Sequence, residues 1–312
     1  MKIFLISDIH PAGKKVLQQA GEVVISSAPE AETVRREAQG AHAIIIRAEG
    51  KVDQQLIDSL PDLKVIGRHG VGVDNIDVEY AKSRGITVVN TPQAPLNATA
   101  EHTIALLLAL SRRIAQLNVT TRQGEWHNES ARSCEELLGK TLGIIGLGQI
   151  GSRVAEIAGQ GIRMKILYYD VNRRLDLEER LHITCCPTIE DLLPQCDYVT
   201  LHVPLKESTR RLMNRERFAL MKPTAALINA SRGGIVDTEA LLETLQNKKI
   251  AAAALDVYDP EPLPRDHPLY SLPNVIMTPH CGGMSRDSLV HMSLVAKDIV
   301  AVLRGEPPRF PV

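Results

Sequence analysis

A glycine-rich segment with the pattern G-x-G-x-x-G constrains the fold of this chain more than any other feature. It runs from Gly146 to Gly151 and directly follows the apolar run 141–145. In this setting Gly146 permits a tight turn, Gly148 lets a ligand approach the backbone, and Gly151 lets a helix pack on a strand. The helix that follows would offer free N–H groups and a positive dipole end to an anion. The segment therefore predicts a βαβ unit that binds the pyrophosphate of a dinucleotide.

An aspartate at the end of the next apolar run indicates which dinucleotide binds. Asp170 closes the run 166–169 and lies nineteen residues after Gly151, the place of the acid that holds the ribose hydroxyls of NAD. Because a carboxylate here would repel the additional phosphate of NADP, NAD is the expected cofactor. Arg173 and Arg174 follow closely and could receive a 2′-phosphate if their loop turned inward.

Short apolar runs alternate with longer helical patterns through most of the chain, which is the rhythm of parallel strands joined by crossover helices. The expected strands are 2–7, 23–26, 43–47, 65–68, 87–90, 141–146, 165–170, 183–186, 198–203, 225–230, 251–257 and 274–279. Longer periodic stretches predict one helix from Ala98 to about Arg122, buried on nearly all sides at its centre, and one from Arg286 to Arg304. The fold class is therefore α/β.

The length of the chain and the order of these patterns predict two domains. A chain of 312 residues exceeds what one hydrophobic core usually supports. The strands form two groups, before and after the helix that begins at Ala98, so two doubly wound parallel sheets are expected. The final helix is expected to return to the first domain. This places a Rossmann NAD-binding domain, 98–283, inside a smaller flavodoxin-like substrate domain formed by 1–97 and 284–312.

Composition excludes several classes of partner. The formal net charge is −1, and the chain has no Lys/Arg-rich run. It therefore has no surplus of positive charge to neutralise a nucleic acid or an anionic membrane surface. No apolar stretch approaches the ~20 residues of a membrane helix. The chain has five cysteines, an odd number with irregular spacing, which does not fit a framework of disulfides. A protein of the reducing cytoplasm is therefore expected. Cys185 and Cys186 are expected to be buried and inert, with a redox pair as the alternative.

Three titratable or charged residues follow predicted strands, where ligands of open α/β sheets bind. Reduction of a 2-oxo acid needs a cation, a proton donor and a partner for that donor. Arg232 can hold a carboxylate with its planar fork, and His280 ends a strand. A hydrogen bond from His280 to Glu261 would favour the protonated imidazole and fix its tautomer. Taken singly, each could equally be a surface charge or a histidine that closes a strand.

Four segments together resemble the D-isomer-specific 2-hydroxyacid dehydrogenase family, and within it the phosphoglycerate dehydrogenase branch. They are 70–77, GVGVDNID; 228–234, INASRGG; 255–263, LDVYDPEPL; and 278–283, TPHCGG. The resemblance implies an NAD-dependent oxidoreductase that transfers a hydride between NAD(H) and a small D-2-hydroxy or 2-oxo acid. The pair 3-phosphoglycerate and 3-phosphohydroxypyruvate is one candidate, and a glyoxylate or hydroxypyruvate reductase is the alternative with the same reaction type.

The resemblance also assigns roles to residues. In reduction His280 would donate the proton, Glu261 would support it and Arg232 would orient the substrate. The backbone N–H groups of Val71 and Gly72 would hold the substrate carboxylate, although their glycine-lined turn alone could equally be a tight strand-to-helix turn. The expected cofactor-binding residues are Gly146, Gly148, Gln149, Ile150, Gly151, Asp170, Val203, Ala230, Ser231, Arg232, Asp256, His280, Gly282 and Gly283.

Three further positions bear on the substrate and on regulation. Arg47 and Arg68 end predicted strands of the first domain and could bind a substrate phosphate, or could be solvated charges. Cys281 stands where the family commonly has an aliphatic or small residue, which puts a thiol next to the general acid and predicts sensitivity to oxidation. No metal is expected at the site. Because the chain stops at Val312, the expected form is the short one without a regulatory domain.

The remaining expectations concern assembly and the competing class of function. A homodimer is expected through the cofactor domain, because the apolar helix 98–122 is followed by the loop Gly124–His127, which contains the only tryptophan, Trp126. The alternative is that Trp126 packs on its own subunit. A non-catalytic NAD-sensing corepressor shares the fold, but the complete catalytic set and the lack of disordered tails argue against it.

Overall fold

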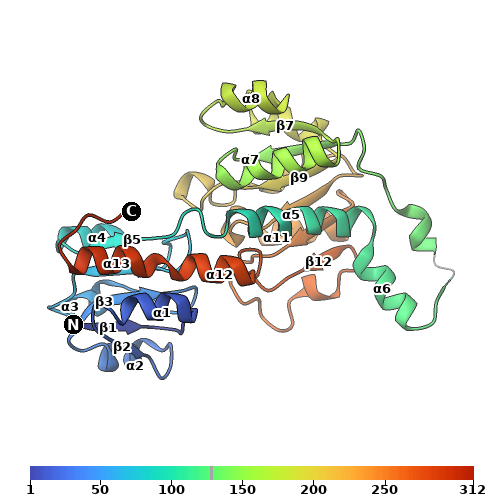
Figure 1. Cartoon of the computed structure of the whole chain (residues 1–312). Helices are drawn as coiled ribbons and strands as arrows, with labels where there is room; N and C mark the ends of the chain where they lie inside the picture. Colours follow the sequence, from blue (N-terminus) through green and yellow to red (C-terminus); the bar gives the residue numbers. More distant parts are fainter. Residues whose placement is uncertain (127–128) are drawn as a thin grey trace. The chain divides into compact units, whose positions relative to one another are not determined.

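The computed structural model describes residues 1–126 and 129–312 and divides into two compact units. Unit 1 comprises Met1–Pro95 and Met284–Val312, and unit 2 comprises Leu96–Gly283. Unit 2 is thus inserted into the sequence of unit 1, and the first break lies two residues before the expected boundary. In Figure 1 unit 1 contains the blue and red ends of the chain, and unit 2 contains the green to orange part.

Unit 1 contains an open five-stranded sheet of order β2-β1-β3-β4-β5, and every pair of neighbouring strands is parallel. Its strands are β1 (Lys2–Leu5), β2 (Glu22–Ile25), β3 (Ala41–Ile46), β4 (Val65–Arg68) and β5 (Thr87–Val89). Its helices are α1 (Pro11–Leu17), α2 (Ala31–Glu37), α3 (Gln54–Asp58), α4 (Val78–Ser83), α12 (Arg286–Ser293) and α13 (Val295–Leu303). This is the flavodoxin-like order expected from the sequence.

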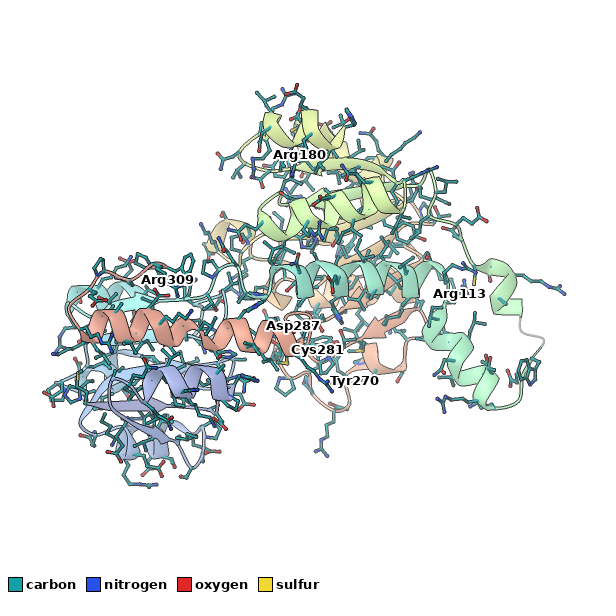
Figure 2. The ribbon with its side chains drawn as sticks, in the orientation of Figure 1. Arg113, Arg180, Tyr270, Cys281, Asp287 and Arg309 are labelled. Carbon is teal, nitrogen blue, oxygen red and sulfur yellow. The ribbon has the colours of Figure 1, made fainter. Side chains whose placement is uncertain are left out.

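An ion pair fixes the C-terminal segment of unit 1 to α13. Asp298 is 1% exposed, and its carboxylate accepts hydrogen bonds from Arg309 through the backbone N at 2.7 Å, Nε at 3.1 Å and Nη2 at 3.2 Å. Arg309 is labelled in Figure 2. Because a buried carboxylate needs such partners, the ion pair holds the segment after α13 against this helix. The helix α13 itself packs on β4 and α1.

Unit 2 contains a wholly parallel seven-stranded sheet of order β12-β11-β10-β9-β6-β7-β8. Its strands are β6 (Thr141–Ile145), β7 (Lys165–Tyr169), β8 (Thr184–Cys185), β9 (Tyr198–Leu201), β10 (Ala226–Asn229), β11 (Ala252–Leu255) and β12 (Val275–Met277). Its α-helices are α5 (Leu96–Ser111), α6 (Ile114–Arg122), α7 (Gln149–Glu156), α8 (Leu175–Leu181), α9 (Ile189–Leu192), α10 (Arg215–Leu220) and α11 (Thr238–Gln246). Short 3₁₀ segments are η1 (Glu129–Ser133), η3 (Leu193–Gln195), η4 (Glu207–Thr209), η5 (Gly233–Ile235) and η6 (Pro268–Ser271), and η2 (Ile157–Gly161) is a π turn.

The strand order of unit 2 creates a switch point between β6 and β9. The chain leaves β6 towards β7 and β8, and then returns to place β9 on the other side of β6. Open α/β sheets bind ligands outside the carboxyl ends of the strands at such a point. The expectation of two doubly wound parallel sheets, with one domain inserted into the other, is confirmed.

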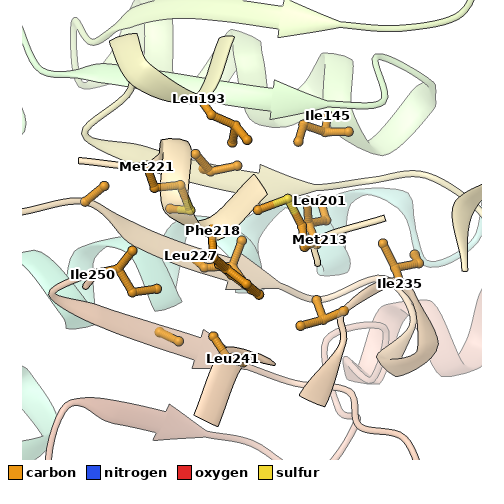
Figure 3. Close-up of a cluster of buried hydrophobic side chains, with 14 of the residues drawn as sticks. Ile145, Leu193, Leu201, Met213, Phe218, Met221, Leu227, Ile235, Leu241 and Ile250 are labelled. Atoms are coloured by element: carbon orange, nitrogen blue, oxygen red, sulfur yellow. The ribbon is translucent and has the colours of Figure 1, made fainter. Parts of the chain in front are cut away.

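Both faces of the unit 2 sheet are buried, which explains why its strands are almost continuously apolar. Val199, Leu227 and Ala253 belong to the cluster under α10 and α11, and Figure 3 shows Phe218 of α10 beside Leu227 in it. Ile144 and Ile228 belong to the cluster on the opposite face, with α5 and α7. Successive strand residues therefore alternate between two cores.

The structure corrects the two long helices predicted from the sequence. The stretch 98–122 is not one helix, because α5 ends at Ser111 and Arg113, in the left-handed conformation with φ 50°, separates it from α6. Nor is α5 buried on nearly all sides, since Leu108 is 40% exposed. The stretch 286–304 divides at Leu294 into α12 and α13. Hydrophobic periodicity does not register a break of one or two residues, so these interruptions were invisible in the pattern.

None of the five cysteines forms a disulfide; Cys186 is buried and Cys185 is half-buried. No helix in the described part of the chain combines the length and the apolar character that crossing a membrane requires.

Candidate functional site

The glycine-rich turn after β6 has no room for a side chain at two of its glycines and is open at the third. Gly146 has φ 96°, and a Cβ there would lie 2.8 Å from the carbonyl C and O of His202. A Cβ on Gly151 would lie 2.1 Å from the carbonyl oxygen of Gly146. Gly148, the N-cap of α7, has no atom within 4 Å of its Cβ position. The turn is therefore closed against the protein on two sides and open at Gly148, which fits the approach of a dinucleotide pyrophosphate.

Asp170 lies next to this turn. It follows β7 directly, its Oδ2 accepts a hydrogen bond from the backbone N of Leu147 at 2.6 Å, and its Oδ1 accepts one from Asn172 N at 3.0 Å. Leu147 lies between the first two glycines of the motif. The structure thus brings together the two parts of the fingerprint, which are separated in the sequence by α7 and β7.

Both arginines after Asp170 form ion pairs. Arg173 donates to Glu178 through Nε and Nη2, each at 2.8 Å, and hydrogen bonds from Arg173 and Tyr168 lower the pKa of Glu178 to about 2. Arg174 donates to Asp176 through Nε and Nη2 at 3.0 Å, and its Nη1 reaches the carbonyl of Leu147 at 3.3 Å. Arg174 therefore lies at the glycine-rich turn, but its charge is already paired.

His280 and Glu261 form a direct hydrogen bond at the carboxyl end of the sheet. The distance from His280 Nδ1 to Glu261 Oε2 is 2.9 Å, and the side chains are 41% and 37% exposed. His280 has φ 52°, and its backbone N donates to the carbonyl oxygen of Asp256 at 2.8 Å. The strand end thus sets the direction of the imidazole, and part of the ring remains accessible.

Arg232 lies in a turn that Asn229 organises. Buried Asn229 ends β10, accepts hydrogen bonds from the backbone N of Ser231 at 3.1 Å and its Oγ at 2.8 Å, and donates to the carbonyl of Arg232 at 2.9 Å. The guanidinium Nη1 of Arg232 donates to the carbonyl of Ser231 at 2.8 Å. A Cβ on Gly233 would lie 1.8 Å from the carbonyl oxygen of Tyr258, so this turn packs directly on the segment after β11. Arg232 and the segment that precedes Glu261 are therefore neighbours.

Asp256 is a buried carboxylate that connects the ends of β11 and β12. It is 1% exposed and accepts hydrogen bonds from Thr278 Oγ1 at 2.5 Å, Cys281 N at 2.9 Å and Gly282 N at 2.8 Å. His102 Nε2 of α5 lies 3.4 Å from its Oδ1. Although burial acts to raise it, these hydrogen bonds lower the pKa of Asp256 to about 2. The group is therefore an ionised carboxylate at neutral pH, and it lies at the expected nicotinamide side of unit 2.

Several residues of this region were missed in the sequence. His102 and Thr278 contact Asp256, and Tyr258 Oη donates to the carbonyls of Leu255 at 2.9 Å and Thr278 at 2.8 Å. His202 follows β9, and burial lowers its pKa to about 4. The available signal for His102 was an imidazole inside an otherwise apolar helical stretch. Its partner could not be identified, because it lies more than 150 residues further along the chain.

The remaining predicted cofactor residues lie at the same strand ends. Val203 follows β9, and its Cγ1 is 2.8 Å from the Cβ position of Gly146. Ala230 is 8% exposed and directly follows β10. Gln149 and Ile150 form the first turn of α7. All of these positions therefore border the carboxyl edge of the unit 2 sheet.

The predicted substrate residues lie in unit 1, at the end of β4 and in the segments that follow β3 and β4. Gly70 has φ 136°, and its backbone N donates to Thr91 Oγ1 at 3.1 Å. The guanidinium of Arg68 donates to the carbonyls of Gly72 at 2.5 Å and His69 at 2.8 Å. Asn90 donates to the carbonyl of Val71 at 2.8 Å. Because C=O and N–H point in opposite directions across a trans peptide, this bond turns the N–H of Gly72 away from Asn90.

Two arginines, Arg47 and Arg68, and the neutral imidazole of His69 lie at the carboxyl ends of the same strands as this turn. The Nη1 of Arg47 donates to the carbonyl of Asp8 at 3.0 Å. His69 is 4% exposed; burial, and then the charges of Arg47 and Arg68, lower its pKa to about 4. Two arginines therefore lie at the carboxyl edge of the unit 1 sheet, and Arg68 is engaged by the turn itself.

The loop expected at a dimer interface is only partly described. Trp126 is 80% exposed, so it does not pack on its own subunit, whereas His127 lies outside the described residues. Ile114 and Val119 of α6 are 56% and 52% exposed. Arg113, labelled in Figure 2, marks the start of this helix.

Comparison with known proteins finds one family and many relatives. The sequence profile described as D-isomer specific 2-hydroxyacid dehydrogenase, NAD binding domain, matches residues 104–282. The chain is 41% identical over 307 residues to a D-3-phosphoglycerate dehydrogenase from Methanocaldococcus jannaschii, a match that covers 98% of this chain and 58% of that protein. It is 39% identical over 315 residues to a glyoxylate reductase from Thermofilum pendens, a match that covers 98% of this chain and 93% of that protein. The chain thus spans little more than half of the first relative and nearly all of the second.

Solved structures agree with this assignment. The TT0316 protein from Thermus thermophilus is 37% identical with a TM-score of 0.93, and the match covers 100% of both chains. An NADPH-dependent glyoxylate/hydroxypyruvate reductase from Sinorhizobium meliloti, in complex with NADP and malonate, is 32% identical with a TM-score of 0.88 over 100% of this chain and 96% of that one. The profile matches more than half of the chain and the relatives match nearly all of it, so this chain belongs to the D-isomer specific 2-hydroxyacid dehydrogenase family, a family of NAD(P)-dependent oxidoreductases.

Proposed function

We propose that this protein transfers a hydride between NAD(H) and a small D-2-hydroxy or 2-oxo acid, with His280, Glu261 and Arg232 as its catalytic residues. The observation that carries the proposal is the 2.9 Å hydrogen bond from His280 Nδ1 to Glu261 Oε2. A general acid needs a partner that fixes its tautomer and favours its charged form. In this pair the bond at Nδ1 leaves Nε2 to exchange a proton with the substrate.

The roles of the chain's residues follow from the charges of the reaction. When bound, the nicotinamide supplies the hydride for reduction or accepts it in oxidation. In the direction of reduction His280 donates a proton to the 2-oxo oxygen, and Glu261 stabilises the imidazolium. Arg232 binds the substrate carboxylate and polarises its carbonyl with its planar donors. We further propose that the N–H groups of Val71 and Gly72 hold the same carboxylate from the turn after β4.

NAD is the proposed cofactor, although the Sinorhizobium meliloti relative is NADPH-dependent. Asp170 lies at the glycine-rich turn with both carboxylate oxygens accepting backbone N–H groups. The charges of Arg173 and Arg174 are paired with Glu178 and Asp176. A 2′-phosphate would therefore meet an ionised carboxylate before it met an available cation.

Two classes of substrate fit the family. The proximity of Arg47 and Arg68 to the carboxyl edge of the unit 1 sheet supports 3-phosphohydroxypyruvate. The second candidate is glyoxylate or hydroxypyruvate, and a specific observation favours it: the guanidinium of Arg68 already donates to the carbonyls of Gly72 and His69. Arg47, with one bond to Asp8, is thus the residue that distinguishes the two.

We also propose a homodimer formed through unit 2. Leu108, Ile114, Val119 and Trp126 are all exposed on or just after α5 and α6. Exposed aromatic and large apolar side chains are enriched at protein interfaces. Trp126, the only tryptophan of the chain, would serve as an anchor.

Replacing the proposed general acid gives the first test. His280→Ala is expected to lower kcat about 10²–10⁴-fold, the usual range for loss of a general acid, while leaving the Kd for NADH within about twofold. Stopped-flow rates and NADH fluorescence titration measure the two effects. His291→Ala, at an exposed histidine of α12, is the control and should behave as wild type. Wild-type turnover in His280→Ala would show that another group donates the proton.

The cofactor assignment predicts a preference for NADH over NADPH of at least about tenfold in kcat/KM, which needs only ~1.4 kcal/mol of repulsion. Asp170→Ala should relax the preference mainly by improving KM for NADPH. Steady-state kinetics with both cofactors at saturating 2-oxo acid would show this. Equal efficiencies in the wild-type enzyme would contradict the assignment.

The substrate class is decided by comparing wild type with Arg47→Gln on 3-phosphohydroxypyruvate and glyoxylate. If Arg47 binds the phosphate, the variant loses about tenfold or more of kcat/KM for the phosphorylated substrate, the effect of one charge-assisted hydrogen bond, and little for glyoxylate. Equal losses on both substrates, or a wild-type enzyme that prefers glyoxylate, would assign the protein to the second candidate. Absence of turnover with every 2-oxo acid would instead favour a non-catalytic NAD sensor.

The proposed dimer is tested by sedimentation velocity of the wild type and of Val119→Asp. A buried, unpaired charge at an interface is costly, so the variant is expected to sediment as a monomer at micromolar concentration. Leu175→Asp, which changes a 63% exposed leucine at the N-terminus of α8, should keep the wild-type coefficient. A monomeric wild type at these concentrations would refute the dimer.

A further inference from the structure

Three side chains with metal-ligating atoms converge beside His280. His102 Nε2, a carboxylate oxygen of Asp256 and Cys281 Sγ all lie within 4.8 Å of one another. They belong to three parts of unit 2: α5, the residue after β11 and the loop after β12. Among the side chains that the structure describes, this is the only such group of three histidine, cysteine or acidic residues. Cys281 is labelled in Figure 2.

The spacing of these atoms matches a small coordination sphere. Nitrogen and oxygen ligands that each lie about 2.0–2.2 Å from a tetrahedral zinc are separated by about 3.4 Å. The observed distance from His102 Nε2 to Asp256 Oδ1 is 3.4 Å. The Cys281 thiol, which would bind zinc at about 2.3 Å, lies within 4.8 Å of both of these atoms. A tetrahedral ion held by these three side chains would take its fourth ligand from water.

The carboxylate is held in place before any cation arrives. Thr278 Oγ1 and the N–H groups of Cys281 and Gly282 donate to Asp256, and such partners orient a metal ligand. Gly282 packs closely against the group, since a Cβ there would lie 2.9 Å from Asp256 Oδ2 and 3.1 Å from His102 Cδ2. The imidazole and the carboxylate therefore have little freedom to separate.

The donor set selects the kind of cation. Imidazole with thiolate suits zinc and its close relatives, whereas magnesium and calcium prefer sites made of oxygen. When the cation binds, the sulfur–metal bond forms as the Cys281 thiol releases its proton to water. The thiolate and the Asp256 carboxylate then carry two negative charges, which balance a divalent cation.

We propose that His102, Asp256 and Cys281 form a binding site for a zinc-type divalent cation. We also propose that its occupation inhibits the enzyme, because the cation engages Asp256 and lies next to His280. The inhibitory part rests on the proposed function, whereas the binding part does not. The expectation that the reaction itself uses no metal is unaffected.

Cobalt(II) is the probe for binding, since it replaces zinc in such sites and is coloured. The metal-free protein, with its whole sequence, is titrated with Co²⁺ in a buffer that contains a non-chelating phosphine reductant. One equivalent is expected to bind with a thiolate-to-cobalt charge-transfer band in the near ultraviolet. Cys281→Ala should abolish the band, and His102→Gln should weaken binding by at least about tenfold. Cys134→Ala, at another half-buried thiol of unit 2, is the matched control and should bind as wild type.

Two results would overturn the binding site: no charge-transfer band in the wild type at excess Co²⁺, or a band that persists in Cys281→Ala. The wild-type result does not depend on whether any variant folds. For the inhibitory role, Zn²⁺ should reduce wild-type turnover and have at least about tenfold less effect on the residual turnover of Cys281→Ala. Equal inhibition of both would refute that role alone. A wild-type protein without turnover before Zn²⁺ is added would count against the proposed function and not against the site.

Discussion

The buried carboxylate of Asp256 is the interaction on which the geometry of the site depends. An ionised group with 1% exposure would cost several kcal/mol if it lacked partners, so the chain around it must supply them. The donors are Thr278 and the backbone N–H groups of Cys281 and Gly282, all from the segment that contains His280. The backbone N of His280 itself donates to the Asp256 carbonyl. One charge therefore fixes the path of the loop and, with it, the direction of the imidazole.

The parallel sheet explains why so many functional groups gather in one place. In a parallel sheet all carboxyl ends lie at the same edge, so residues that follow different strands become neighbours. Asp170 after β7 thus meets the glycine-rich turn after β6, at Leu147 N. Gly233 after β10 packs on Tyr258 after β11 with no room for a Cβ. The same rule applies in unit 1, where Arg47 and Arg68 mark the ends of the adjacent strands β3 and β4.

The groups at the carboxyl edge of the unit 2 sheet suit both the proposed reaction and the proposed cation site. The proposed reaction uses the imidazole of His280 next to the buried carboxylate of Asp256, and carboxylate and imidazole groups are also ligands for a zinc-type cation. The thiol of Cys281 completes the proposed cation site. Cys281 has no part in the proposed reaction, so its thiol is the ligand of the proposed cation site that the reaction does not require.

The sequence by itself determined the class of the fold, the position of most strands, the glycine-rich turn with Asp170, and the candidates Arg232, Glu261 and His280. These are local signals: apolar runs, glycine spacing and motifs whose residues follow one another directly. The breaks at Arg113 and Leu294 left no trace in the hydrophobic pattern, because one residue in an unusual conformation changes no periodicity. Only the tertiary structure decided that His102 meets Asp256, that Arg68 is engaged by the turn after β4, and that Trp126 is exposed. The contact of His102 with Asp256 joins segments more than 150 residues apart, and the exposure of Trp126 depends on what fails to cover its side chain. The Arg68 bonds reach only residues 69 and 72, but they depend on the backbone path of the turn, which no apolar run or motif indicates.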